Sequence, residues 1–137
     1  MAFLAVSALA AAQNPFVQTW YTSDPAPMVA GDRMYVYTGH DEDGADFFWM
    51  NEWRAYSTAD MVNWTHSAID FPTRWPHRFD RDALTQVWAP QTIYDPEEGK
   101  YMVYYAIGES GKNYITYYSY ANEDFTDLTE PQVLYNH

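Results

Sequence analysis

The sequence predicts an all-β fold built from two consecutive copies of one four-stranded antiparallel unit. Short runs rich in Tyr, Val, Ile and Thr are bounded by Gly, Asp and Pro turn signals, and no stretch has a sustained helical period with caps. The second observation is an internal repeat, because Pro27 and Pro90, each preceded by an alanine, lie 63 residues apart. Met61 matches Phe125 at a distance of 64 residues, which is about the length of the repeat.

Each unit is predicted to hold four strands. In the first unit, a short buried strand is followed by the turn signal Gly31-Asp32 and then by a strand that alternates between two faces. The strands expected in this unit are Pro27 to Ala30, Met34 to Thr38, Trp53 to Thr58 and Asn63 to Ile69. Those expected in the second unit are Trp88 to Tyr94, Lys100 to Ala106, Tyr114 to Ala121 and Gln132 to Tyr135.

This repetition favours one all-β architecture over another. Four antiparallel strands that recur at a fixed period are typical of β-propeller blades. A sandwich of eight strands is the competing fold, and it predicts evenly spaced strands but no self-similarity at this period. We therefore interpret the chain as about two blades of a β-propeller.

The order of the strands places the long connections on one face, here called the upper rim. The upper rim receives Asp24 together with three segments, Gly39 to Glu52, Phe71 to Val87 and Gly108 to Asn113, whereas the opposite face holds only tight turns. Long loops that gather on one face usually carry function. The other side chains of interest on this rim are His40, Asp41, Trp49, Trp75 and Trp88.

The composition narrows the classes of function. A net charge of −12 repels phosphate backbones, so nucleic acid is not an expected partner. Aromatic residues make up 19% of the chain, which suits strand cores and also surfaces that stack on sugars. The chain has no Cys, which excludes thiol catalysis and Cys-based metal sites. No apolar run approaches the roughly 20 residues of a membrane span.

The first twelve residues differ from the remainder of the chain. They are rich in Ala and lack charged side chains, and Ala10-Ala11-Ala12 has the small-x-small form of a signal-peptidase site. We interpret residues 1–12 as a residual signal peptide ahead of a domain at 13–137, which predicts a secreted or periplasmic protein. The alternative is a plain disordered or helical N-terminus.

Four motifs together carry a resemblance to a known family. They are Ser-Asp-Pro-Ala-Pro-Met-Val at 23–29, Tyr-Thr-Gly-His-Asp at 37–41, Ser-Thr-Ala-Asp-Met-Val-Asn-Trp at 57–64 and Val-Trp-Ala-Pro-Gln at 87–91. In this order and spacing they resemble glycoside hydrolase family 43, and the match covers nearly the whole chain after about Asn14. That family consists of five-bladed β-propellers, inverting enzymes that trim arabinose- and xylose-containing plant polysaccharides.

The resemblance implies a division of catalytic roles. It implies a general base on the innermost strand of the first blade, an Asp at the start of the third blade that tunes the pKa of the acid, and a Glu further on that is the acid. Only the base has a match here, at Asp24, and the other two carboxylates would lie beyond His137. We therefore expect an N-terminal fragment that is inactive alone, with a carbohydrate as its partner.

Each candidate residue also has a structural alternative. Asp24 precedes Pro25, and Asp-Pro is common as a turn device. Trp88 is expected to form a wall of the sugar site, and the alternative is a Trp in the core between blades. His40 and Asp41 are expected to bind sugar hydroxyls, unless they are solvated loop residues. More distant sugar subsites are assigned to Trp49 and Trp75.

No metal or cofactor is assigned within the chain. The run Asp41 to Asp46 is similar to a calcium loop, but its Gly stands at the fourth place rather than the sixth. The four His residues lack the spacing of zinc ligands. A structural calcium elsewhere in a complete propeller stays open. Two alternatives to this enzyme also stay open, namely a non-catalytic carbohydrate-binding propeller and a glycosidase of another five-bladed family.

Overall fold

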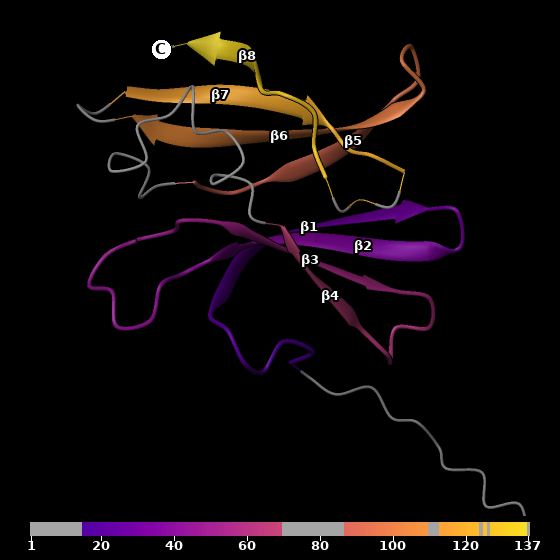
Figure 1. The fold of residues 1–137 in the computed structure, drawn as a ribbon, viewed down its shortest axis with the longest axis horizontal. Coiled ribbons are helices and arrows are strands. Elements are labelled where there is room, and N and C mark those ends of the chain that lie inside the picture. The colour runs from indigo at the N-terminus through magenta and orange to yellow at the C-terminus, as the bar shows by residue number, and fades with distance from the viewer. Residues whose placement is uncertain (1–14, 70–86, 110–112, 124, 126, 137) are drawn as a thin grey trace, which may run out of the picture.

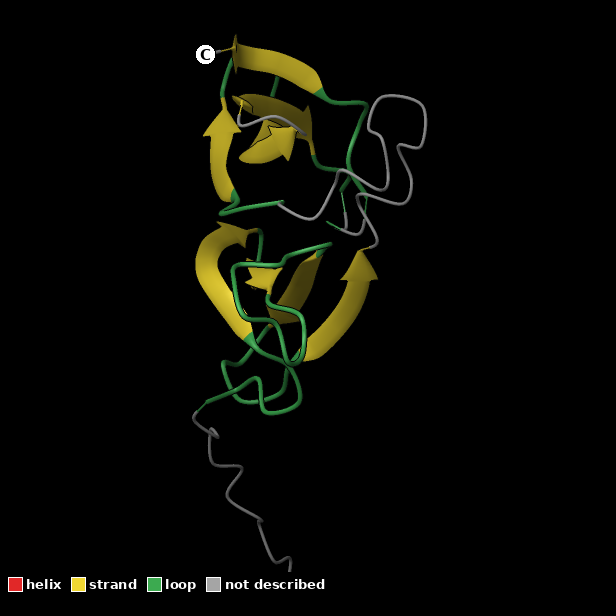
Figure 2. Cartoon of the chain, turned by 90° about the vertical axis from the view of Figure 1, so that its left-hand side faces the viewer, coloured by secondary structure: helices red, strands yellow, loops and turns green. Residues whose placement is uncertain are grey.

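The computed structural model describes residues 15–69, 87–109, 113–123, 125 and 127–136. They form two four-stranded antiparallel sheets that pack against each other (Figure 1), and the described residues contain strands and loops but no helix (Figure 2). Within these residues there is accordingly no helix long and apolar enough to cross a membrane. The predicted all-β fold is confirmed.

The first sheet is a simple meander in the order β1-β2-β3-β4. Its strands are β1 (Thr22–Ala30), β2 (Arg33–His40), β3 (Trp53–Thr58) and β4 (Thr65–Ile69). The third strand has the predicted bounds, whereas β1 begins five residues before the predicted start at Pro27. It begins earlier because an irregularity after Ser23 lets Thr22 and Ser23 keep their pairing with β2.

The second sheet repeats the meander in the order β5-β6-β7-β8. Its strands are β5 (Gln91–Asp95), β6 (Lys100–Glu109), β7 (Asn113–Tyr120) and β8 (Gln132–Asn136). The prediction that β5 starts at Trp88 is wrong, because the strand begins only after Pro90, which has no N–H to donate to a ladder. The chain approaches the sheet nonetheless, since Val87 forms an isolated bridge with Ile107.

The core lies between the two sheets and is rich in aromatic side chains. The indole of Trp53 packs on the ring of Tyr105 at 4.7 Å between centroids, and its N–H donates to the backbone oxygen of Trp88 at 3.1 Å. The hydroxyl of Tyr37 donates to the backbone oxygen of Phe125 at 3.2 Å. These contacts, and those between the innermost strands β1 and β5, join the two sheets into one body.

The sequence repeat is visible in the backbone. Met61 and Phe125, which the repeat aligns, both take the left-handed conformation, with φ of 61° and 57°. This conformation is uncommon for a residue with a side chain, so its recurrence at aligned places is a specific sign of one repeated unit. Two four-stranded meanders packed face to face are the arrangement of neighbouring β-propeller blades. We call β1–β4 blade 1 and β5–β8 blade 2.

The two ends of the strands differ as predicted in blade 1 but not in blade 2, where the connection between β7 and β8, residues 121–131, is longer than that between β6 and β7 on the other rim, residues 110–112. Of the predicted rim segment 71–87, residues 71–86 lie outside the described residues. The tight turns after β1, β3 and β5 lie together on the right of Figure 1, and the long loop between β2 and β3 lies on the left. That left side is the upper rim. Asp24 and His40 lie there, since Thr22 pairs with His40, while the turn after Asp95 lies at the far end of β5.

Candidate functional site

Asp24 occupies a β-bulge at the start of the innermost strand of blade 1. Ser23 pairs with Gly39 and Ala26 pairs with Tyr37, so Asp24 and Pro25 together oppose one residue of β2. The φ of Asp24 is 49°, in the left-handed region, which Asp tolerates better than most residues. Bulges re-aim side chains next to active sites. The side chain of Asp24 is exposed, and its carboxylate has no hydrogen bond or ion pair with another described residue.

A glycine, Gly39, pairs with Ser23 immediately beside the bulge. A Cβ atom added at Gly39 would come within 2.9 Å of the Ser23 hydroxyl oxygen and 3.2 Å of the Met50 sulfur. Contacts this short force neighbouring atoms to move. Gly39 therefore lets Ser23 and Met50 pack closely against β2 beside the bulge.

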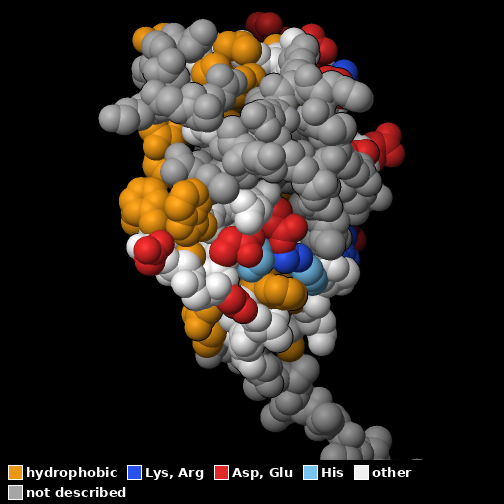
Figure 3. All heavy atoms as spheres, turned by 60° about the vertical axis from the view of Figure 1, so that its left-hand side comes forward, with side chains coloured by type: hydrophobic (Ala, Val, Ile, Leu, Met, Phe, Trp, Pro, Cys, Tyr) orange, Lys and Arg blue, Asp and Glu red, His pale blue; other side chains and the backbone are white. Residues whose placement is uncertain are grey.

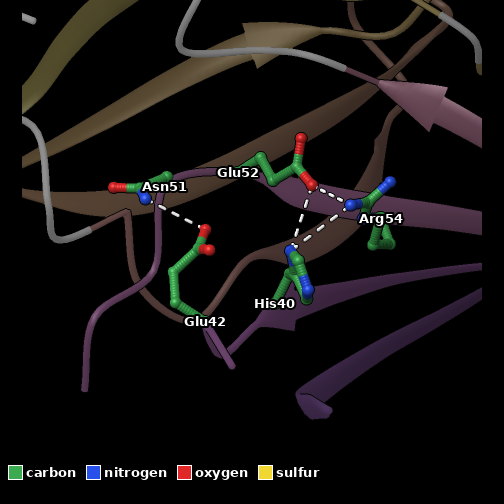
Figure 4. Close-up of polar contacts among 5 residues, drawn as sticks. All are labelled: His40, Glu42, Asn51, Glu52 and Arg54. Atoms are coloured by element: carbon green, nitrogen blue, oxygen red, sulfur yellow. Dashed lines mark hydrogen bonds and ion pairs between the residues drawn. The ribbon is translucent and has the colours of Figure 1, made fainter. Parts of the chain in front are cut away.

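The side chains of His40, Glu52 and Arg54 form a partly buried polar cluster beside this strand end. One oxygen of Glu52 lies 3.0 Å from Nδ1 of His40 and also forms an ion pair with Arg54, as Figure 4 shows. The indole of Trp20 covers the cluster, with its ring 4.4 Å from the guanidinium and edge-on to the imidazole. Because His40 ends β2 and Glu52 precedes β3, the cluster joins the two ends of the loop 41–52.

The loop 41–52 is folded on itself by its own hydrogen bonds. The backbone N–H of Glu42 donates to the oxygen of Trp49 at 2.9 Å, and the amide of Asn51 donates to the Glu42 carboxylate at 2.9 Å (Figure 4). The indole N–H of Trp49 donates to the Asp46 carboxylate at 3.4 Å. The N–H of Asp41 donates to the backbone oxygen of Tyr21 at 3.1 Å, which ties the loop to the segment that leads into β1.

Trp88 lies on the same rim, at the start of blade 2. Its indole is half-buried and stacks on the ring of Tyr114 at 4.7 Å with an angle of 29° between the planes. Its N–H is buried and has no partner among the described residues. The ring of Phe48, from the loop of blade 1, meets it edge-on at 6.5 Å. The rim is thus continuous from one blade to the next.

The face of blade 1 turned away from blade 2 is covered in part by residues 15–20. Phe16 stacks on Trp64 with 4.0 Å between centroids, and a small cavity of about 190 Å³ lies behind the bulge, lined in part by Pro25 and Thr38. On this face burial lowers the pKa of His66, and the nearby charge of Arg54 lowers it further. This face therefore favours the neutral form of the imidazole.

Comparison with known proteins identifies the family. A family model described as "Probable glycosyl hydrolase domain", related to glycosyl hydrolase family 43, matches residues 12–137. The chain belongs to this glycosyl hydrolase family. A search of the curated proteins finds no significant match.

Solved structures of family 43 enzymes share the fold of this glycosyl hydrolase chain. A family 43 enzyme from Xanthomonas citri complexed with xylotriose has a TM-score of 0.67 and 22% identity over 85% of this chain and 34% of that chain. A β-xylosidase/α-arabinofuranosidase from a compost microbial metagenome, in a calcium-free form with xylotriose, has a TM-score of 0.67 and 20% identity over 90% and 38%. An arabinanase of Bacillus subtilis has a TM-score of 0.58 and 20% identity over 85% and 40%. The fold is a β-propeller, and this chain spans less than half of each of these proteins.

The residues predicted from the sequence meet on one rim, with one exception. The structure places Asp24, His40, Asp41, Trp49 and Trp88 at the strand ends and loops of the upper rim. Trp75 lies outside the described residues. The roles assigned to these side chains remain predictions, and that of His40 has to accommodate its burial and its contact with Glu52.

The polar partners of His40 were not found from the sequence. Glu52 and Arg54 stand two residues apart, and this spacing puts two side chains of a strand on one face, so a signal existed. Two carboxylates of the acidic loop, those of Glu42 and Asp46, accept hydrogen bonds from Asn51 and Trp49. The described residues contain no group of three or more carboxylate or imidazole side chains that could hold a metal ion.

Proposed function

We propose that this chain forms the first two blades of a glycosidase that hydrolyses arabinose- or xylose-containing glycans, with Asp24 as its general base. Family membership supports the reaction class. The observation that carries the assignment of the residue is the backbone of Asp24, a left-handed residue in a bulge that turns an unpaired carboxylate onto the functional rim.

The inverting mechanism of glycoside hydrolysis needs a carboxylate that is exposed to water and free to accept a proton. In the inverting mechanism, a base removes a proton from a water molecule while the oxygen of that water attacks the anomeric carbon. A second carboxyl group, about 6.5–9.5 Å away, protonates the leaving oxygen from the opposite face of the sugar. Water reaches Asp24 because its side chain is exposed. Its oxygens are available to accept a proton because no described residue binds them.

We propose that the general acid lies in another part of the complete propeller. The matched structures are about two and a half to three times as long as the part that this chain spans, since it covers 34% to 40% of each. A glycosidase needs both carboxyl groups, so we expect this chain alone to bind glycans weakly and not to hydrolyse them.

The pentose class of substrate rests on the matched structures. They include complexes with xylotriose and xylose and an arabinanase. Such glycans are plant polysaccharides outside the cell, so we also propose a secreted or periplasmic location for the enzyme. The segment 1–12, which carries the signal-peptide pattern, lies outside the described residues.

The test is a hydrolysis assay on the complete propeller. Arabinan, arabinoxylan and xylo-oligosaccharides are the substrates, starch is the control polysaccharide, and proton NMR follows the anomeric configuration of the first product. We expect pentose release with inversion and no action on starch. Binding without hydrolysis would instead support the non-catalytic carbohydrate-binding propeller, and retention of configuration would exclude Asp24 as a base that activates water.

A further inference from the structure

The cavity of about 190 Å³ on the face of blade 1 turned away from blade 2 lies directly behind the proposed base. Ser23 and Pro25, the two chain neighbours of Asp24, both belong to its wall, whereas Asp24 itself does not. The wall also contains Thr38, the residue of β2 that opposes the bulge. The cavity therefore borders the stretch of backbone that sets the direction of the Asp24 side chain.

Another part of the cavity wall is apolar and comes from outside the sheet. It is made by Pro15, Phe16 and Val17, and the ring of Phe16 is held on blade 1 by its stack on Trp64 at 4.0 Å between centroids. A water molecule occupies about 30 Å³ in the liquid, so a cavity of this size has room for more than one.

Two hydroxyl groups of the wall have no hydrogen-bond partner. The side-chain oxygens of Ser23 and Thr38 are buried, and neither bonds to another described residue. Thr38 is 3% exposed. The Nε atom of Arg54 is likewise buried and unpaired, and Arg54 pairs with Thr38 across β2 and β3, which puts both side chains on one face of the sheet. Buried polar groups in native proteins are bonded to protein or to ordered water.

The bulge adds backbone groups to this requirement. The extra residue of a bulge has no ladder partner, and Pro25 has no N–H to donate. The left-handed backbone of Asp24, with φ of 49°, is uncommon for a residue with a side chain and persists only where its surroundings hold it. Ladder pairs hold the chain on each side of the bulge. Between them, the occupant of the cavity determines how firmly Asp24 is held.

The chemistry of the wall favours water over an apolar occupant. Cavities lined only by apolar groups stay dry and take up benzene or xenon, whereas a buried water molecule needs two to four polar partners. The hydroxyl groups of Ser23 and Thr38 and the backbone of the bulge provide such partners. The surface at this end of blade 1 is also polar, since Figure 3 shows carboxylate, histidine and arginine side chains gathered there beside hydrophobic ones.

We propose that this cavity is a site for ordered water and that Thr38, through this water, is a positioning residue for the base at Asp24. The water molecules bind the hydroxyl groups of Ser23 and Thr38 and the backbone of the bulge, and so fix the direction of the carboxylate. They are distinct from the water that attacks the sugar, because Asp24 is exposed and is not part of the cavity wall. The positioning role rests on the proposed function, whereas the water site does not.

The water site is tested by a crystal structure of the complete propeller at a resolution that shows ordered water, together with a xenon derivative of the same crystals. We expect at least one ordered water molecule within about 3.2 Å of Oγ1 of Thr38, and no xenon in the cavity. Xenon in the cavity, or a protein side chain that fills it and bonds to Thr38, would overturn the site.

The positioning role is tested by two substitutions at Thr38 in the complete propeller. Thr38→Val keeps the shape of the side chain but removes the hydroxyl group, whereas Thr38→Ser keeps the hydroxyl group and removes a methyl group. Thr38→Val should lower kcat on xylo- and arabino-oligosaccharides about tenfold and leave KM within about twofold, and Thr38→Ser should keep kcat within about threefold of wild type. A purely structural role predicts the larger loss for Thr38→Ser, because deletion of a buried methyl group leaves a cavity. That order, or an unchanged kcat in Thr38→Val, would disprove the positioning role.

A matched control is Thr92→Val. It also removes a buried hydroxyl group that bonds to no described residue, but in β5 of blade 2 and outside the cavity wall. It should leave kcat within about twofold of wild type. If Thr38→Val does not fold, Ser23→Ala provides the kinetic result, and a fall in kcat of about threefold or more with an unchanged KM is expected. If the wild-type propeller hydrolyses no pentose glycan, the proposed function and the positioning role fail together, while the crystal structure still decides the water site.

Discussion

Blade 1 and blade 2 share a topology but differ at the start of their innermost strands. With the 63-residue offset between Pro27 and Pro90, Asp24 aligns with Val87. Val87 is fully buried, with 0% exposure, and bridges to Ile107, whereas Asp24 is exposed in a bulge with a left-handed backbone. The same place in the repeat therefore serves packing in one blade and presents a carboxylate in the other.

A second aligned pair shows the same backbone with opposite burial. Met61 and Phe125 share the left-handed conformation, but Met61 is 55% exposed and Phe125 is 4% exposed. Phe125 packs on Tyr35 of blade 1 and its backbone oxygen accepts the hydrogen bond of Tyr37. The repeated backbone is thus a scaffold, and burial against the neighbouring blade decides what each side chain does on it.

The largest expected effect on stability comes from a charge placed at Val87, the buried residue that aligns with Asp24. Val87→Asp places an unpaired charge in the core and should lower the free energy of unfolding by about 4 kcal/mol or more. Asp24→Ala, at the aligned exposed place, should change it by less than about 1 kcal/mol. Denaturant titration followed by tryptophan fluorescence measures both. Equal losses would show that the two places do not differ as described.

Trp53 tests the junction between the blades. Trp53→Ala removes a buried indole that packs on Tyr105 and should cost about 3–5 kcal/mol of stability. Trp53→Phe keeps an aromatic ring on Tyr105 and loses the hydrogen bond to the backbone oxygen of Trp88, worth about 1 kcal/mol, so it should cost less than Trp53→Ala. If the two variants were equally destabilised, the hydrogen bond rather than the packing would hold the blades together.

Glycine substitutions at Met61 and Phe125 should change the free energy of unfolding in opposite directions. Met61→Gly relieves a left-handed backbone at an exposed turn and should raise the free energy of unfolding by up to about 1 kcal/mol. Phe125→Gly relieves the same backbone but empties a buried ring position, and should lower it by about 3 kcal/mol. Thermal unfolding of the two variants decides, and a gain at both places would contradict the burial of Phe125.

The smallest expected effect is a pH dependence in blade 1. Burial and the charge of Arg54 lower the pKa of His66 below its ordinary value of 6.5, while Glu52 opposes this and His40 adds to it. The unfolded chain then binds the proton more readily, so this contribution to stability is complete above pH 6.5 and is lost as the pH falls below it. The midpoint of thermal unfolding should decrease from pH 7.5 to pH 5, and His66→Gln should reduce the decrease.

The sequence was sufficient for the features that depend on local pattern and repetition. The eight strands, their division into two blades and the rim that carries Asp24 follow from period-two alternation, turn residues and the repeat. Strand ends were less predictable, because Pro90 removes a ladder donor and the bulge after Ser23 extends β1. Neither consequence is visible until the partner strand is known.

The cluster around His40 could not be predicted from the sequence for a related reason. It joins side chains from two strands separated by a loop, and its geometry depends on the register that pairs Gly39 with Trp53. A one-residue shift of that register would send Glu52 and Arg54 to the other face. The cavity behind the bulge likewise arises from a tertiary contact, the packing of residues 15–17 on blade 1.

The most direct test of the central claim is the turnover of the Asp24→Asn variant of the complete propeller. An amide nearly keeps the shape of the carboxylate but cannot take the proton of water. We expect kcat on xylo- and arabino-oligosaccharides to fall by about a thousandfold or more, while the Kd for these oligosaccharides stays within about threefold of wild type. Turnover within about tenfold of wild type would rule out Asp24 as the general base.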